Sequence, residues 1–104
     1  MVASNISALN DVFNDDPRVT IPENATFAEL FSALHDYFLA TTENVWRMFD
    51  DELAEHFSDE LRGEIIELEV INPSRASETR VLDVFVAHGY SEHEVSLYLP
   101  IEWI

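Results

Sequence analysis

The stretch Glu64-Ile65-Ile66-Glu67-Leu68-Glu69-Val70 decides the expected fold class. From Ile66 onward, apolar and acidic residues alternate with a period of two, which is typical of a β-strand with one buried and one solvent-facing side. Arg62-Gly63 precedes this pattern and Asn72-Pro73-Ser74 follows it, and both are turn signals. We therefore predict a strand between these two turns.

Two further apolar segments extend the prediction from one strand to a sheet. Residues 81–87 and 95–99 contain several Val together with Phe85 and Tyr98, residue types that favour strands, and the turn-rich segment 88–93 connects them. Consecutive strands joined by short connections usually pair with each other. The C-terminal half is therefore predicted to form a three-stranded antiparallel β-meander.

Upstream of this predicted sheet, apolar residues recur with the period of a helix. Thr26-Phe27-Ala28-Glu29 has the form of a capping box, and a helical stripe follows it: Phe27, Leu30, Phe31, Leu34 and Phe38. A second stripe runs to about Ser58: Val45, Trp46, Phe49, Leu53 and Phe57. We predict a helix for each stripe, and the two helices are expected to form a hairpin.

The N-terminal segment is predicted to add a short helix, because Ile6, Leu9, Val12 and Phe13 have helical spacing. Asp15-Asp16-Pro17 ends it, and Arg18–Pro22 is predicted to be an extended connector. Together these patterns predict an α+β fold, with two to three N-terminal helices packed on one face of the three-stranded meander. At 11.9 kDa, residues 1–104 are expected to form a single acidic domain.

Charge is the strongest indication of function. The chain contains 21 Asp and Glu, five Arg and no Lys, for a formal net charge of −16. Such an excess repels phosphate backbones and anionic membranes, so direct binding to nucleic acid or to a membrane is not expected. A basic DNA-binding protein or nuclease is the expected partner.

The acidic residues concentrate in one part of the chain. Residues 50–69 carry nine acids and one Arg, which is half of the net charge. We predict that these nine acids bind the partner: Asp50, Asp51, Glu52, Glu55, Asp59, Glu60, Glu64, Glu67 and Glu69.

The predicted spacing of these acids resembles a row of phosphates. On a helix, Asp51 with Glu55 and Glu55 with Asp59 would each lie about 6 Å apart along the axis. On a strand, Glu67 and Glu69 would lie about 6.6 Å apart on the same face. A folded chain of this mass carries one net charge per about 370 Å² on average, against about 110 Å² for duplex DNA. The charge must therefore gather on about a third of the surface if the protein is to imitate DNA.

Catalytic and cofactor signals are weak. The absence of Cys excludes thiolate chemistry, and the two glycines, Gly63 and Gly89, are too far apart for a phosphate-binding loop. The best His constellation, His88 with Glu92, His93 and Glu94, is expected to be a polar connection. His56 is expected to be a helix-end residue, where a cation suits the helix dipole. We predict no enzymatic activity, no cofactor and no metal site.

Three functions are compatible with this sequence. The preferred hypothesis is an acidic DNA-mimic inhibitor, encoded by a phage or mobile element, that blocks the basic groove of a DNA-processing protein such as a host-defence nuclease, a CRISPR effector or a repair enzyme. The alternatives are an immunity protein or antitoxin against a cationic nuclease toxin, and a haloadapted structural domain. A cytoplasmic location is expected, because no signal-peptide pattern or membrane-length apolar run occurs. The apolar tail with Trp103 is expected either to complete the fold or to anchor an interface, including a homodimer.

Overall fold

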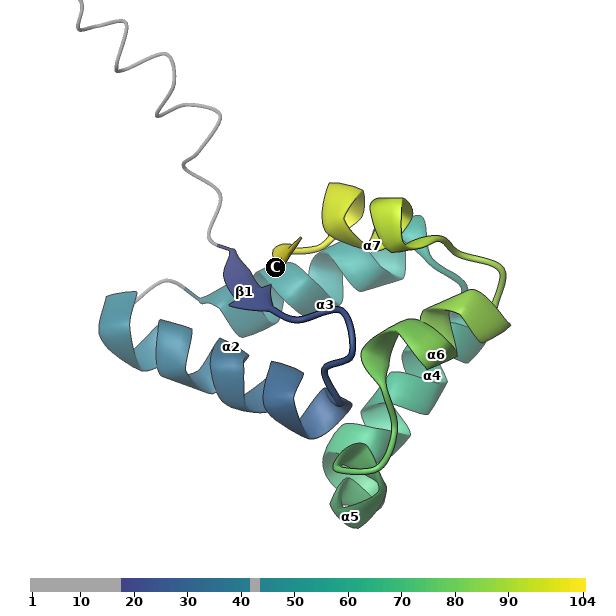
Figure 1. Ribbon diagram of the computed structural model, residues 1–104, viewed down its shortest axis with the longest axis horizontal. Coiled ribbons are helices and arrows are strands. Elements are labelled where there is room, and N and C mark those ends of the chain that lie inside the picture. Colours follow the sequence, from purple (N-terminus) through teal and green to yellow (C-terminus); the bar gives the residue numbers. More distant parts are fainter. Residues whose placement is uncertain (1–17, 42–43) are drawn as a thin grey trace, which may run out of the picture.

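Figure 1 shows the computed structural model, which describes residues 18–41 and 44–104. This part of the chain is mostly helical, with 68% of its residues in helices. The elements in chain order are β1 (Val19–Ile21), α2 (Phe27–Thr41), α3 (Val45–His56), α4 (Asp59–Ile66), the π-helical turn η1 (Glu67–Ile71), α5 (Pro73–Ala76), α6 (Val81–Ala87), α7 (Glu92–Tyr98) and β2 (Ile101–Trp103). The helix predicted around residues 6–13 lies outside the described residues.

The two helices predicted from the long apolar stripes are confirmed as α2 and α3. The Thr26 backbone N–H donates to Glu29 Oε1 at 2.8 Å, and the Glu29 N–H donates to Thr26 Oγ1 at 3.3 Å, which completes the expected capping box. Asn44 caps α3, because its side-chain oxygen accepts from the Arg47 N–H at 3.0 Å. Both stripes face the core, where Leu30, Leu34 and Leu53 are buried, except that Phe38 at the end of the first stripe is 40% exposed.

The strand predicted over residues 64–70 is wrong, because this segment is the end of α4 and the turn η1. Leu61, Ile65 and Leu68 are buried at i, i+4 and i+7, which is the period of a helix. Ile66 and Val70 would share the buried side of a strand with Leu68, but they are 38% and 68% exposed. The alternation of acidic and apolar residues therefore reflects a helix that also exposes apolar side chains.

The other two predicted strands are also wrong, and no antiparallel meander forms in the described part of the chain. Residues 81–87 form α6 and residues 95–98 belong to α7. Ser91 and Glu94 form a capping box at the start of α7, a sequence signal that the strand prediction overlooked. The connection between the two helices is a turn as expected, and Gly89 adopts a φ of 91° there.

The sheet consists of two short parallel strands from opposite ends of the described chain. Val19, Thr20 and Ile21 in β1 pair with Ile101, Glu102 and Trp103 in β2, respectively. The Arg18 guanidinium supports this junction by donating to the Ser96 carbonyl at 3.0 Å. The segment predicted as an extended connector, Arg18–Pro22, therefore contains strand β1, and the apolar tail with Trp103 forms strand β2.

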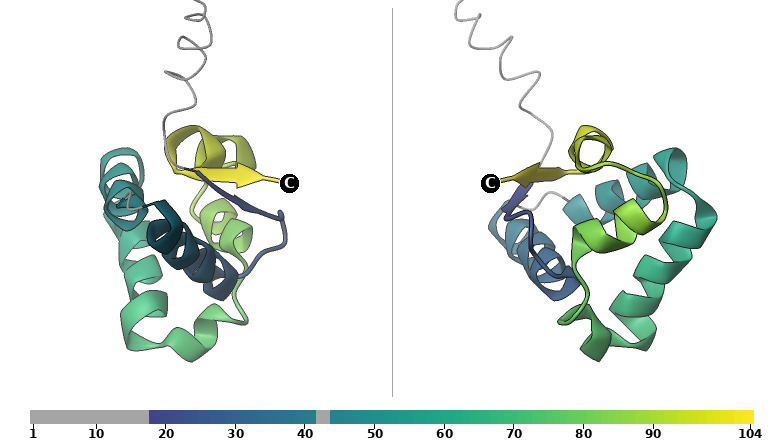
Figure 2. Two further views of the ribbon diagram at one scale, coloured as in Figure 1. Left: turned by 90° about the vertical axis from the view of Figure 1, so that its left-hand side faces the viewer. Right: turned by 45° about the vertical axis from the view of Figure 1, so that its right-hand side comes forward.

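The core lies between the helices, and aromatic side chains fill much of it. Phe57 packs edge-on against Phe85 and Tyr90, with ring centroids 5.2 and 4.7 Å apart. The Tyr90 hydroxyl also accepts from the Ser58 N–H at 3.1 Å, which holds the corner between α3 and α4. Beyond this corner, α4 runs along one margin of the molecule down to α5 (Figure 2).

Candidate partner-binding face

The nine predicted site residues all lie on α3, α4 and η1, which follow one another without a long loop. We call residues 50–69 the acidic segment. Asp50 and Glu52 are half-buried, and the other seven carboxylates are exposed: Asp51, Glu55, Asp59, Glu60, Glu64, Glu67 and Glu69. The buried side of the segment is apolar, so the structure directs these charges toward solvent.

The row of carboxylates on α3 is shorter than predicted. Asp51 and Glu55 lie one helical turn apart, about 6 Å along the axis, as expected. The helix ends at His56, however, and Phe57 is extended before Ser58 caps a new helix. The predicted spacing of Glu55 and Asp59 along a single helix is therefore wrong.

A second row of carboxylates lies on α4 and the first residue of η1, where the sequence pattern predicted a turn and a strand. Glu60, Glu64 and Glu67 follow at i, i+4 and i+7 and therefore share one side of the helix. Glu67 and Glu69 do not share a face, since residues two apart in a helix point to nearly opposite sides. The strand spacing predicted for that pair is therefore wrong. The row formed by Glu60, Glu64 and Glu67 nevertheless keeps a linear array of carboxylates like the one predicted.

Most carboxylates of the acidic segment have a partner within the chain. The Arg62 guanidinium donates to both Asp50 oxygens at 3.2 and 3.0 Å, and Glu64 lies 3.0 Å from His88 Nε2. Weaker pairs join Arg47 to Asp51 and Arg75 to Glu67, each at 3.8 Å, while Glu52 and Glu55 both contact His56. Within residues 18–41 and 44–104, Asp59, Glu60 and Glu69 form no ion pair, so these three charges are available to a partner.

A hydrogen bond and partial desolvation change two proton affinities in this segment. The hydrogen bond with Asp50 raises the pKa of the Arg62 guanidinium, and the negative charge of Asp50 raises it further. Glu69 is an exposed residue, but partial desolvation of its carboxyl raises its pKa, and Asp50 adds to this effect. Protonation of Glu69 is therefore favoured relative to an isolated glutamate.

A third group with a shifted pKa lies outside the acidic segment. A hydrogen bond with Glu23 is the main cause that raises the pKa of Glu92, with smaller contributions from burial and from the charge of Glu23. Glu23 precedes α2 and Glu92 begins α7, so two carboxyls from distant parts of the sequence meet here. Sequence spacing gave no indication of this contact.

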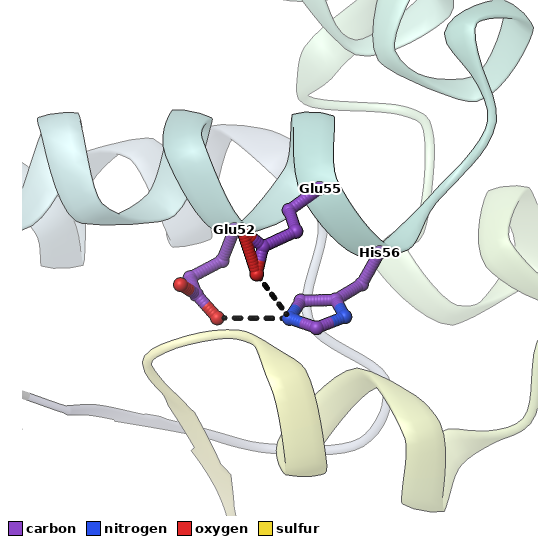
Figure 3. A group of neighbouring side chains, drawn as sticks. All are labelled: Glu52, Glu55 and His56. Atoms are coloured by element: carbon purple, nitrogen blue, oxygen red, sulfur yellow. Dashed lines mark ion pairs between the residues drawn. The ribbon is translucent and has the colours of Figure 1, made fainter.

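The His constellation considered from the sequence does not assemble. His88 contacts Glu64, whereas Glu94 accepts from the backbone N–H of Ser91 at 2.9 Å. His56 lies at the end of α3, as predicted, but the convergence of Glu52 and Glu55 on its ring was not predicted (Figure 3). The spacing of these three residues, at i, i+3 and i+4, was the signal that could have found this cluster.

Comparisons with known proteins gave no match to a family model, to a curated protein or to a solved structure. Among the described residues, no helix has the length and apolarity required to cross a membrane.

Proposed function

We propose that this protein is an acidic inhibitor that occupies the DNA-binding groove of a basic DNA-processing protein. The observation that carries the proposal is the concentration of nine carboxylates on α3, α4 and η1, seven of them exposed. This segment holds half of the net charge of −16. Because the average surface charge density of the protein is below that of duplex DNA, imitation of DNA requires the charge to be concentrated in this way.

The carboxylates of the acidic segment would take the places of DNA phosphates. They would pair with Arg and Lys of the groove and release the counterions held there. Asp59, Glu60 and Glu69 can do so without losing an ion pair to a described residue. The other six would exchange an internal partner for one in the groove. Exposed pairs contribute only about 0–1 kcal/mol, so their exchange costs little. The two-hydrogen-bond pair of half-buried Asp50 with Arg62 is the exception and is expected to stay intact. Binding should therefore be fast and strongly weakened by salt.

A pull-down from bacterial lysate, eluted in steps of rising salt, tests the proposal when two triple variants are compared with the wild type. One variant removes the unpaired charges of the acidic segment, as Asp59→Asn, Glu60→Gln and Glu69→Gln. The control removes the same number and types of charge from exposed positions elsewhere, as Asp36→Asn, Glu78→Gln and Glu102→Gln. Thermal melts establish that both variants remain folded.

We expect the wild type and the control to capture the same basic DNA-binding protein and to block its DNA binding. The acidic-segment variant should release that protein at lower salt and inhibit it less. Equal loss in both variants would show that only the overall charge matters, and would contradict a defined binding face. Capture of a nuclease toxin encoded beside this gene would make the chain an immunity protein. Failure to capture any basic protein, together with folding only in molar salt, would favour haloadaptation.

A further inference from the structure

The last turn of α3 brings together three side chains that can bind a metal ion. Glu52, Glu55 and His56 each offer one donor atom, and these atoms all lie within 4.8 Å of one another. His56 Nε2 lies 3.3 Å from Glu52 Oε2 and 3.3 Å from Glu55 Oε2. Figure 3 shows both carboxylates turned toward the same nitrogen of the ring. The cluster thus offers one nitrogen and two oxygen donors, whereas the other carboxylates of the acidic segment offer oxygen donors alone.

We propose that Glu52, Glu55 and His56 form a surface site for a divalent transition metal of the Zn²⁺ class. Tetrahedral Zn²⁺ binds His nitrogen and carboxylate oxygen at about 2.0–2.2 Å, which places neighbouring ligand atoms roughly 3.3–3.5 Å apart. Both distances from His56 Nε2 to the carboxylates fall in this range. The two carboxylate oxygens lie within 4.8 Å of each other. A metal ion bound to Nε2 therefore needs no large movement of the imidazole, and the exposed carboxylate side chains can supply the remaining adjustment.

The imidazole of His56 is already oriented for this role. Its ring stacks on Tyr98 of α7, with centroids 4.2 Å apart and planes inclined by 16°. The His56 side chain is only 29% exposed, whereas that of Glu55 is 69% exposed. Because stacking restricts the ring, metal binding needs to order only the carboxylate side chains, and the entropic cost is lower than for three free side chains.

Space for a further ligand lies beside the cluster. A cavity of about 140 Å³ is lined by Glu52 and Tyr98, together with Arg18, Met48 and residues 97–100. This volume is large enough for water molecules. Three protein ligands leave one tetrahedral position open, and water can occupy it, as in zinc sites that keep an exchangeable ligand.

The donor set also determines which cations the site prefers. Mg²⁺ and Ca²⁺ favour oxygen ligands, whereas an imidazole nitrogen suits Zn²⁺, Ni²⁺ and Cu²⁺. Competition with Mg²⁺ therefore separates binding at the cluster from general accumulation of cations around a chain of net charge −16.

Calorimetric titration of ZnCl₂ into the full chain, in excess MgCl₂ at neutral pH, tests the site. The key variant is His56→Ala, and the matched control is His88→Ala, which removes a His that contacts only one described carboxylate, Glu64. We expect the wild type and the control to bind one Zn²⁺ with similar affinity. The His56 variant should bind at least about 10- to 100-fold more weakly, the loss usual even for an outer-shell partner.

Two further measurements separate loss of a ligand from loss of the fold. The double variant Glu52→Gln and Glu55→Gln keeps His56 and should also lose Zn²⁺ binding. NMR of the wild type should show the His56 ring signals shifting with Zn²⁺ while those of His35 do not. Zn²⁺ binding that is unchanged in His56→Ala, or that leaves the His56 ring signals in place, would overturn the proposal.

Discussion

Truncation of Leu68 and Val70 distinguishes the helical structure of residues 64–71 from the strand that the sequence pattern predicts. In a strand these two side chains would lie on the same buried side, and both truncations would be costly. In the structure Leu68 is 1% exposed and Val70 is 68% exposed. Leu68→Ala should therefore destabilise the protein strongly, and Val70→Ala should change its stability little.

The expected magnitudes follow from burial. Leu68→Ala removes three buried carbons, which is about 2.4 kcal/mol at about 0.8 kcal/mol per carbon, and the cavity left behind brings the loss to about 3 kcal/mol. Val70→Ala removes two carbons that are about one-third buried, a loss of about 0.5 kcal/mol. The higher helix propensity of Ala offsets most of that loss.

Urea unfolding followed by circular dichroism at 222 nm measures both changes in the free energy of unfolding. For a domain of this size, about 3 kcal/mol corresponds to a decrease in Tm of about 12 °C or more. The exposed Val70 provides the matched control, because it lies in the same segment and is also truncated to Ala. Similar losses of about 2 kcal/mol or more in both variants would refute the helical assignment.

The two glycines should respond in opposite directions, because Gly63 lies inside α4 with open space where a Cβ would project, whereas Gly89 has a φ of 91°. We expect Gly63→Ala to stabilise the protein by about 0.5–1 kcal/mol and Gly89→Ala to destabilise it by about 1 kcal/mol in the same urea assay, and destabilisation by Gly63→Ala would contradict a helix at that position. Stability should also depend on pH, because the folded-state pKa values of Glu69 and Glu92 lie above the ordinary value of 4.5. At these two groups the folded state binds more protons than the unfolded state, so the stability that they contribute is fully present below pH 4.5 and is lost as pH rises through their folded-state pKa values. Glu69→Gln and Glu92→Gln should each flatten this decrease in Tm, and an unchanged profile in both variants would contradict the shifts.

Local signals in the sequence predicted part of the fold correctly. Thr26 and Glu29 marked the start of α2, and the apolar stripes of α2 and α3 extended over enough residues to define the helical period. The same kind of signal, Ser91 with Glu94, marks α7, but the short apolar run after it resembled a strand. Over five to seven residues, Val, Ile and Phe fit either period, so packing decides between them.

The candidate site shows the same division. Sequence alone identified the nine carboxylates of residues 50–69 and the position of His56 at a helix end. It could not show that α4 and η1 together align Glu60, Glu64 and Glu67, because the strand prediction placed these residues in different elements. It also missed the convergence of Glu52 and Glu55 on His56, which depends on side-chain orientation as well as spacing.

Composition and local periodicity by themselves determined that this chain is acidic, that it lacks Cys chemistry and that its first two apolar stripes form helices. These properties follow from residue type and from contacts within a few positions of the sequence. Only the tertiary structure decided that residues 64–71, 81–87 and 92–98 are helical and that Val19–Ile21 pairs with Ile101–Trp103. That pairing joins segments about 80 residues apart, and burial of Phe85 and Val95 in the core that they share with Leu68 outweighs the local preference of Phe and Val for strands.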